Sequence, residues 1–244
     1  MRAEVMTLGT PNPRQREFLA CEKKYVAFGG ARGGGKSWAV RCKAKLLALR
    51  YAGIRILLVR RSLAELEANH LAFLRQELAD VAEYRAGERQ FRFCNGSVLQ
   101  FGYCGCDRDL NRYQGAEYDV IFLDEATQLK EQWMRQIAAC VRGVNDFPKR
   151  IYYTCNPGGP GHGYIKRLFI DRRFEDGEQP EDYAFIPARV TDNTALLARQ
   201  PDYLKTLEAL PYKLRRAWLE GRWDVFAGQV FQEFTDDPDH YDDR

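Results

Sequence analysis

The stretch "FGGARGGGKSWAV", Phe28 to Val40, surrounds one lysine with glycines and follows it with a serine. Residues 30–37 satisfy the pattern G-x4-G-K-[ST], in which glycines let the backbone fold tightly and point its N–H groups at a phosphate chain. Residues 24–28 (KYVAF) predict a buried strand, and residues 36–52 predict a helix. Because a phosphate loop lies between a strand and the first turn of a helix, we expect this stretch to hold a nucleoside triphosphate.

The residues of this loop are the candidates for nucleotide contact: Gly30, Ala31, Arg32, Gly33, Gly34, Gly35, Lys36 and Ser37. Lys36 is predicted to reach the β- and γ-phosphates of ATP and so to take part in catalysis, and the Ser37 hydroxyl is predicted to ligate Mg²⁺. The N-terminus of the following helix adds a partial positive charge. The alternative is a glycine-rich turn with a solvated lysine, which the flanking strand and helix disfavour.

An acidic pair follows another apolar run, "VIFLDEATQ" at 120–128. An acidic residue at the end of such a strand reaches Mg²⁺ through its water shell, which makes Asp124 the second candidate for the metal. Glu125, one residue on, is the candidate to polarise the attacking water. A surface Asp-Glu pair is common by itself, but a pair after a buried strand and downstream of a phosphate loop predicts repeated ATP hydrolysis.

Apolar runs alternate with helical patterns along the chain, which predicts an α/β fold with a mainly parallel sheet flanked by helices. Between the glycine loop and the acidic pair lie a further buried strand at 54–59 and a helix at 62–81. That spacing resembles the additional-strand, catalytic-glutamate (RecA-like) class of P-loop NTPases, in which a strand separates the phosphate-loop strand from the acidic one. The other predicted segments are a hairpin at 90–103, buried strands at 118–124 and 150–156, and a strand at 184–190.

The first of the predicted helices has Ala39, Cys42, Leu46 and Leu49 on one side, which we expect to face the core. The strand at 150–156 ends in Asn156, at the same edge of the sheet as the nucleotide. Asn156 is therefore a candidate to sense the γ-phosphate or the water. The alternative is a plain strand-end turn made by Asn-Pro-Gly-Gly.

Composition is that of an ordinary globular chain of 244 residues, 45% hydrophobic and 29% charged, with a net charge of +3 that neither demands nor forbids a nucleic-acid partner. No apolar run approaches the roughly 20 residues that span a bilayer, and the N-terminus lacks the apolar core of a signal peptide. The seven scattered cysteines indicate reduced thiols. We therefore expect an intracellular protein, with Cys94, Cys104 and Cys106 as packing residues rather than zinc ligands.

Taken in order, these segments resemble the ATPase domain of the large terminase subunit of tailed bacteriophages, over nearly the whole chain. "GGARGGGKS" is similar to the family's phosphate loop, "VRRSLAELEANHL" to the segment after the second strand, and "YQGAEYDVIFLDEATQ", the most specific stretch, to its acidic strand. "TCNPGGPGHGYIKRLF" looks like the coupling motif, and "LRRAWLEGRWDVFAGQVFQEF" resembles the hinge before the nuclease domain. "PNPRQREFL" looks like the adenine-binding segment, in which Gln15 would read the base edge.

The resemblance implies an ATP-driven motor that moves double-stranded DNA into a procapsid in the host cytoplasm. The implied partners are the portal protein, the procapsid, the small terminase subunit and further copies of the chain in a ring, with no membrane. We expect residues 1–195 to form the ATPase core and residues 196–244 a small helical linker before a nuclease domain. The acidic tail, with Asp236, Asp237, Asp239, Asp242 and Asp243, is expected to be linker, so we expect no nuclease activity.

Ring ATPases of this kind complete each site with an arginine from the neighbouring subunit. Some relatives place it directly before the Gly-Ala that precedes the acidic strand, where this chain has Gln114. Arg112 is our first candidate for that role and Arg142 a weaker one, whereas Arg32 would act within its own subunit. An ordinary surface arginine is the alternative for each.

Several other residues are expected to have no chemical role. His70 should only cap or pack on its helix, His162 should be solvated in its loop, and His240 falls in the tail. A local basic patch, Lys166, Arg167, Arg172 and Arg173, is expected to be a solvated face, with DNA-backbone contact as the alternative. The rival functions are a RecA-like helicase or recombination ATPase, and a slow ATP-dependent assembly switch.

Overall fold

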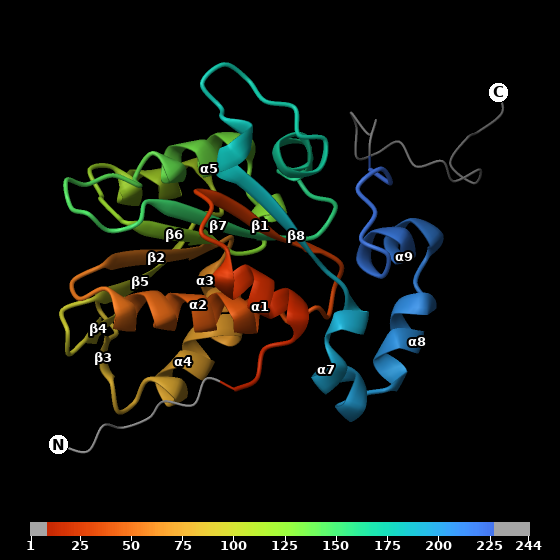
Figure 1. The fold of residues 1–244 in the computed structure, drawn as a ribbon, viewed down its shortest axis with the longest axis horizontal. Coiled ribbons are helices and arrows are strands. Elements are labelled where there is room, and N and C mark those ends of the chain that lie inside the picture. Colours follow the sequence, from red (N-terminus) through yellow and green to blue (C-terminus); the bar gives the residue numbers. More distant parts are fainter. Residues whose placement is uncertain (1–8, 227–244) are drawn as a thin grey trace.

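Parallel strands form the centre of the computed structural model, which describes residues 9–226 (Figure 1). The strands are β1 (Tyr25–Gly30), β2 (Arg55–Arg60), β3 (Ala82–Arg85), β4 (Gln90–Phe93), β5 (Val98–Tyr103), β6 (Val120–Leu123), β7 (Arg150–Cys155) and β8 (Tyr183–Ala188). The helices are α1 (Pro13–Ala20), α2 (Lys36–Arg50), α3 (Leu63–Leu66), α4 (Ala72–Glu77), α5 (Glu131–Ala138), α6 (His162–Ile165), α7 (Thr194–Arg199), α8 (Asp202–Glu208) and α9 (Tyr212–Trp218). Shorter helical turns are η1 (Glu67–Leu71), η2 (Asp107–Tyr113), η3 (Ala126–Gln128), η4 (Lys166–Ile170), η5 (Pro180–Asp182) and η6 (Val190–Asp192).

The described strands form one sheet in the order β3-β4-β5-β2-β6-β7-β1-β8. Along this order, all neighbouring strands from β5 through β2, β6, β7 and β1 to β8 pair in parallel. Strands β3 and β4 add an antiparallel edge next to β5. The expected additional-strand arrangement is therefore confirmed. The strand that separates β1 from the acidic strand β6 is β7, however, whereas β2, which comes between them in sequence, lies on the far side of β6.

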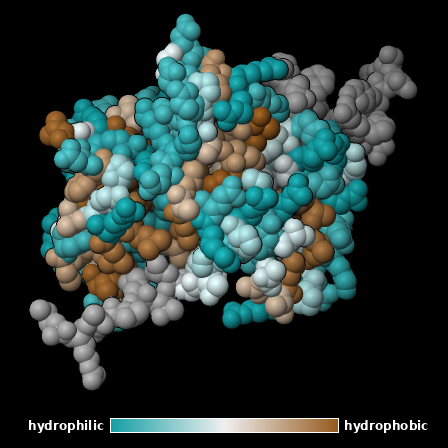
Figure 2. Space-filling model, in the orientation of Figure 1, coloured by the Kyte–Doolittle hydropathy of each residue, from teal (hydrophilic) through white to brown (hydrophobic). Residues whose placement is uncertain are grey.

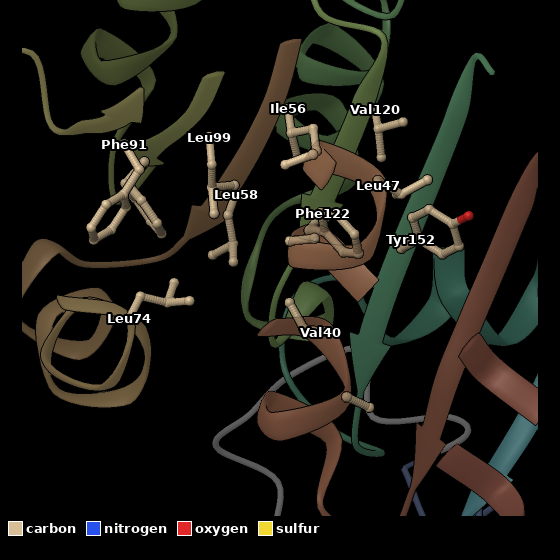
Figure 3. Packing of buried hydrophobic residues seen from close by; sticks show 14 of the residues in the cluster. Val40, Leu47, Ile56, Leu58, Leu74, Phe91, Leu99, Val120, Phe122 and Tyr152 are labelled. Atoms are coloured by element: carbon tan, nitrogen blue, oxygen red, sulfur yellow. The ribbon is translucent and has the colours of Figure 1, made fainter. Parts of the chain in front are cut away.

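Helices cover both faces of the sheet, and each face has its own hydrophobic cluster (Figure 1). On the face of α1, α2 and α4, Val40 and Leu47 of α2 pack over Ile56, Phe122 and Tyr152 of the central strands (Figure 3). On the other face, α5 and the α6–η4 segment cover the alternate residues of the same strands. Burial on both faces explains the near-continuous apolar runs of β1, β2 and β6.

The helix predicted at 62–81 begins as expected, because the Ser62 side chain accepts a hydrogen bond from the backbone of Glu65. It then passes through a π-helical turn, η1, and ends at Glu77, and the chain continues into the unpredicted short strand β3. The predicted hairpin is β4–β5, with Gly96 in the left-handed region at φ 84°. A π-helical turn inside an α-helix is rare and is frequently found at a functional site.

Helix α2 differs from its predicted face. Leu46 and Leu49 are exposed, whereas Lys43 and Lys45 are buried. Lys43 Nζ donates to the backbone oxygens of the last turn of α1, and Lys45 Nζ lies 2.6 Å from the Glu77 carboxylate of α4. The long basic side chains of α2 thus tie the two neighbouring helices to it, and the leucines lie outside these contacts.

The last described helices, α7 to α9, pack beside the glycine loop. The Asn193 side chain donates a hydrogen bond to the Gly33 oxygen at 2.7 Å, and the Arg32 backbone N–H donates to the Trp218 oxygen at 2.8 Å. Pro211 is the residue directly before α9. The boundary drawn at 195/196 stays a prediction, and the acidic tail and His240 lie outside the described residues.

The face of the molecule in Figure 2 is mostly hydrophilic, with hydrophobic patches toward the side where Figure 1 draws α2 and α4. Leu46, Leu49 and Phe73 are among the large hydrophobic side chains exposed there. Within residues 9–226, every helix is too short or too polar to cross a lipid bilayer.

Candidate functional site

A cleft of about 720 Å³ opens at the carboxyl ends of the parallel strands, beside the N-terminus of α2. Its volume lies within the range of about 300–1,000 Å³ that is usual for small-molecule sites. The parallel sheet explains its position, because the strands β1, β2, β6 and β7 all end at this edge. The cleft is lined by Arg32, Gly33, Gly34 and Gly35 of the glycine loop, by Lys36, Ser37 and Asn156, and by Arg60 and Glu125. Gly30 and Ala31, the first residues of the loop, are not among the lining residues.

The glycine loop is held tightly from outside the cleft. A Cβ atom on Gly29 would overlap the Cys155 carbonyl oxygen of the neighbouring strand, and one on Gly34 would lie 2.9 Å from the Ala188 Cβ. Gly35, the residue before α2, has φ 76°, a conformation that glycine adopts without strain. Because the loop is fixed by its neighbours, its backbone N–H groups are preorganised at the start of α2.

Lys36 is buried in the cleft wall. Its Nζ donates hydrogen bonds to the Ala31 backbone oxygen and to Asn156 Oδ1, the latter at 2.8 Å. Burial lowers the pKa of Lys36, while the nearby carboxylates of Glu125 and Asp124 act in the opposite direction. A polyanion in the cleft would favour the charged ammonium, and Asn156 is hydrogen-bonded to that ammonium.

Asp124 is almost completely buried behind the cleft. Thr154 Oγ1 donates to its Oδ1, His70 Nε2 lies 2.7 Å from its Oδ2, and Arg60 Nη1 lies 3.2 Å from the same oxygen. Burial by itself would raise the pKa of Asp124, but the charge and hydrogen bond of His70, the charge of Arg60 and the Thr154 hydroxyl together hold it well below its usual range. Asp124 is therefore an anion at every ordinary pH.

Glu125 has an unusual backbone, with φ 53° and ψ 47°. Non-glycine residues rarely adopt this left-handed conformation, and those that do are often at functional sites. Its N–H donates to Thr154 Oγ1 at 2.8 Å, so the same hydroxyl bridges Glu125 and Asp124. Its side chain is one-third exposed, lines the cleft, and lies 3.6 Å from Arg60 Nη2.

The arrangement fits a magnesium ion that is bound mainly through phosphate and water. Within the described residues, no group of three or more His, Cys, Asp or Glu side chains is placed to hold a metal. Mg²⁺ at nucleotide sites needs only one or two protein ligands, because phosphates and waters supply the rest. Ser37 in the cleft and the ionised Asp124 behind it are the residues that would hold it.

The structure gives Gln15 different neighbours from those the resemblance implied. Gln15 Oε1 accepts from the Asn12 N–H and so caps α1, and Gln15 Nε2 donates to the Gly35 oxygen at 3.0 Å. Gln15 is buried and supports the glycine loop from behind. A contact between the Gln15 side chain and a base edge stays a prediction.

The candidate arginines occupy three different environments. Arg32 lines the cleft, and its guanidinium lies 3.4 Å from the Trp218 ring centroid. Arg112 lies outside the cleft, where Nη2 is 2.7 Å from Asp109 Oδ1 and the guanidinium stacks on Tyr103. Arg142 is exposed and lies 3.5 Å from Glu117. An action of Arg112 or Arg142 on a neighbouring subunit stays a prediction.

The expectation that His162 is solvated is wrong, whereas His70 packs as expected and its lack of a chemical role stays a prediction. His70 is fully buried and contacts Asp124, because the π-helical turn η1 directs it toward the end of β6. His162 is also buried: its Nδ1 accepts from the Gly158 N–H at 3.0 Å, and its ring stacks on Trp223. The His70 contact has no local signal, since His70 and Asp124 are 54 residues apart.

Half of the basic patch is neutralised by ion pairs. Lys166 Nζ lies 2.6 Å from Asp171, and Arg167 Nη1 lies 2.8 Å from Glu178. These pairs reduce the charge that the segment offers to DNA.

Comparison with known proteins gives one family and one fold. Residues 27–235 match the family described as "Terminase large subunit, T4likevirus-type, N-terminal". A large terminase from a thermophilic bacteriophage, in complex with ADP, aligns at TM-score 0.70 and 15% identity, covering 87% of this chain and 53% of that one. Its complex with ATP-gamma-S aligns at TM-score 0.69 and 16% identity, covering 87% and 52%.

The large terminase ATPase domain of Thermus phage P74-26 aligns at TM-score 0.62 and 13% identity, covering 88% of this chain and 94% of that one. At these identities the likeness shows the fold. This chain spans about half the length of the first of these large terminases. Among curated protein sequences, none matches the chain.

Proposed function

This chain belongs to the N-terminal, T4likevirus-type family of terminase large subunits, and we propose on that premise that it hydrolyses ATP to drive double-stranded viral DNA into a procapsid. One observation carries the proposal: Lys36 and Ser37, from one part of the chain, and Glu125, from another, line one cleft of nucleotide size. The Asp124 carboxylate behind the cleft, whose pKa is lowered, would help to hold the magnesium ion that accompanies a triphosphate.

In this proposal the glycine loop and Lys36 bind the β- and γ-phosphates and neutralise the charge that develops during transfer. Ser37 and Asp124 hold Mg²⁺, which supplies further positive charge when bound. Glu125 orients and polarises the attacking water. Asn156, hydrogen-bonded to Lys36 at 2.8 Å, is the candidate to pass the loss of the γ-phosphate to residues 157–163.

We further propose the partners of such a motor: double-stranded DNA, the portal and procapsid, the small terminase subunit, and other copies of this chain in a ring in the host cytoplasm. Arg112 is the proposed residue that completes a neighbouring site. Its exposed position outside its own cleft is compatible with that role.

The test is the ATPase rate as a function of protein concentration, with and without portal-bound procapsids and double-stranded DNA. We expect Lys36→Ala to abolish hydrolysis, and Glu125→Gln to retain ATP while turnover falls by a factor of about 100 or more. Arg112→Ala should lower turnover only where subunits assemble.

Three outcomes would count against the proposal. Absence of ATP and Mg²⁺ binding in calorimetry would remove the ATPase. A preference for single-stranded DNA as the activator would favour a RecA-like helicase. Turnover that stays slow in the presence of DNA and procapsids would favour an assembly switch.

A further inference from the structure

His70 is a fully buried side chain whose one hydrogen-bond partner, within residues 9–226, is the carboxylate of Asp124. Its Nε2 lies 2.7 Å from Asp124 Oδ2, and its Nδ1 has no partner there. The two side chains are 0% and 1% exposed. Burying a polar group costs free energy unless it is hydrogen-bonded, so the contact with Asp124 is what compensates for the burial of this imidazole.

The element that carries His70 is the π-helical turn η1, which lies between α3 and α4. Such turns are rare and recur at functional sites. This one brings a ring nitrogen to the end of β6, the strand that precedes the acidic pair. The local backbone and the buried contact therefore point to the same residue.

The Asp124 carboxylate is hydrogen-bonded at both of its oxygens. Thr154 Oγ1, on β7, donates to Oδ1, and His70 contacts Oδ2. An ionised carboxylate only accepts hydrogen bonds, so His70 Nε2 is the donor. Arg60 Nη1 lies 3.2 Å from Oδ2 without hydrogen-bonding geometry, which leaves His70 as the donor to this oxygen among the described residues.

Two donors fix the plane of a carboxylate, whereas one does not. The torsion about the Cβ–Cγ bond of aspartate is broadly populated, so a carboxylate held at one oxygen can still turn about that bond. Mg²⁺ demands near-ideal octahedral geometry, which a turned carboxylate does not meet. Removing a hydrogen-bond partner of a metal-binding side chain commonly lowers metal affinity by about 10–100-fold.

We propose that His70 is a positioning residue for magnesium, which fixes the orientation of the carboxylate that helps to hold the ion. The inference rests on the proposed ATPase function, in which Ser37 and Asp124 hold Mg²⁺. His70 acts only through Asp124 and touches neither the nucleotide nor the metal. The alternative is that His70 does no more than stabilise a buried carboxylate.

The test is equilibrium binding of a fluorescent ATP-gamma-S analogue, measured in EDTA and at increasing concentrations of Mg²⁺. His70→Phe keeps an aromatic ring in the same place and removes the donor. We expect the Mg²⁺ concentration for half-maximal enhancement of binding to rise by about tenfold or more, and the affinity in EDTA to change by less than about threefold. His70→Gln, whose amide N–H can donate to Oδ2, should recover much of that shift.

Leu74→Val is the matched control for a loss of packing around the same helix. Leu74 is on α4, one helical turn after His70, and is fully buried in the hydrophobic cluster that includes Val40 and Leu47 of α2. Its truncation should lower Tm, because it removes buried apolar contacts. It should leave the Mg²⁺ dependence of binding unchanged, because the Asp124 carboxylate keeps both donors.

The outcomes distinguish the inference from the proposed function. If the unaltered protein binds no nucleotide, the proposed function fails, and binding that is independent of Mg²⁺ would overturn the metal site together with the role of His70. If Mg²⁺ enhances binding but His70→Phe shifts its dependence no more than Leu74→Val does, or if His70→Gln recovers nothing, only the role of His70 fails. Thermal unfolding identifies a variant that does not fold. If His70→Phe is one, His70→Asn, whose shorter amide does not reach Oδ2, is compared with His70→Gln, and an equal Mg²⁺ dependence of the two refutes the role.

Discussion

The Thr154 hydroxyl is hydrogen-bonded to both acidic residues of the site, and its removal should be costly. It accepts the Glu125 N–H at 2.8 Å and donates to Asp124 Oδ1, and Thr154 is only 1% exposed. Thr154→Val keeps the shape of the side chain but leaves a peptide N–H and a carboxylate oxygen without this partner. The same change also frees the left-handed backbone of Glu125.

The magnitude follows from the two bonds. A hydrogen bond to a charged group contributes about 1.5–3 kcal/mol, and one to a neutral peptide group about 0.5–1.5 kcal/mol. Asp124 keeps its contacts with His70 and Arg60, so we expect a loss of about 2–4 kcal/mol in the free energy of unfolding. For a chain of this size that corresponds to a fall of roughly 5–15 °C in Tm.

The assay is thermal unfolding followed by circular dichroism, together with ATP turnover at saturating ATP. Turnover should fall by a factor of about 100, because Glu125 is no longer held in place. Thr206→Val is the matched control, since Thr206 is exposed and its hydroxyl bonds only to the Asp202 backbone oxygen. A Tm for Thr154→Val that is as close to the unaltered protein as that of Thr206→Val would refute the reasoning.

Two further predictions concern charge. The pKa of Asp124 is lower in the folded protein than in the unfolded chain, so its stabilising contribution is complete above the unfolded value of about 3.9 and is lost as the pH falls toward the folded value. The free energy of unfolding of Asp124→Asn should therefore decline less steeply than that of the unaltered protein between about pH 5 and pH 2. Equal slopes, measured by urea titration at each pH, would contradict this. Trp218→Leu should lower the free energy of unfolding by about 1–2 kcal/mol, because the contact with the Arg32 guanidinium is lost. Trp218→Phe should retain much of that stabilisation. Equal losses in the two variants would show that the cation–π contact contributes nothing.

The central strands β1, β2, β6 and β7 could be predicted because each is a nearly continuous apolar run, and burial on both faces requires such a run, whereas the edge strand β3 lacks it. The glycine loop and the acidic pair could be predicted because each sits at a strand end within a few residues of sequence. The position of β7 between β1 and β6 could not, since chain order does not specify sheet order. The contact of His70 with Asp124 could not be predicted either, since His70 lies in a π-helical turn that the sequence pattern does not indicate.

Side-chain burial on α2 shows another limit of sequence patterns. Periodicity assigned Leu46 and Leu49 to the core and gave no reason to bury Lys43. The neighbouring helices change which side chains of α2 are buried. Lys43 is buried because its ammonium donates hydrogen bonds to carbonyl oxygens at the end of α1. Such a contact depends on which helices become neighbours, and hydropathy does not contain that information.

The residues of the glycine motif are needed for two different reasons, the packing of the fold and the binding of phosphate. Gly29 and Gly34 are required by the strands and loops that press against them, whether or not a phosphate is ever bound. A descendant that had lost hydrolysis would still need both residues in order to fold. In a survey of related chains, conservation of these glycines would therefore indicate a shared fold. Only Lys36 and Glu125 would distinguish chains that hydrolyse ATP from chains that have lost hydrolysis.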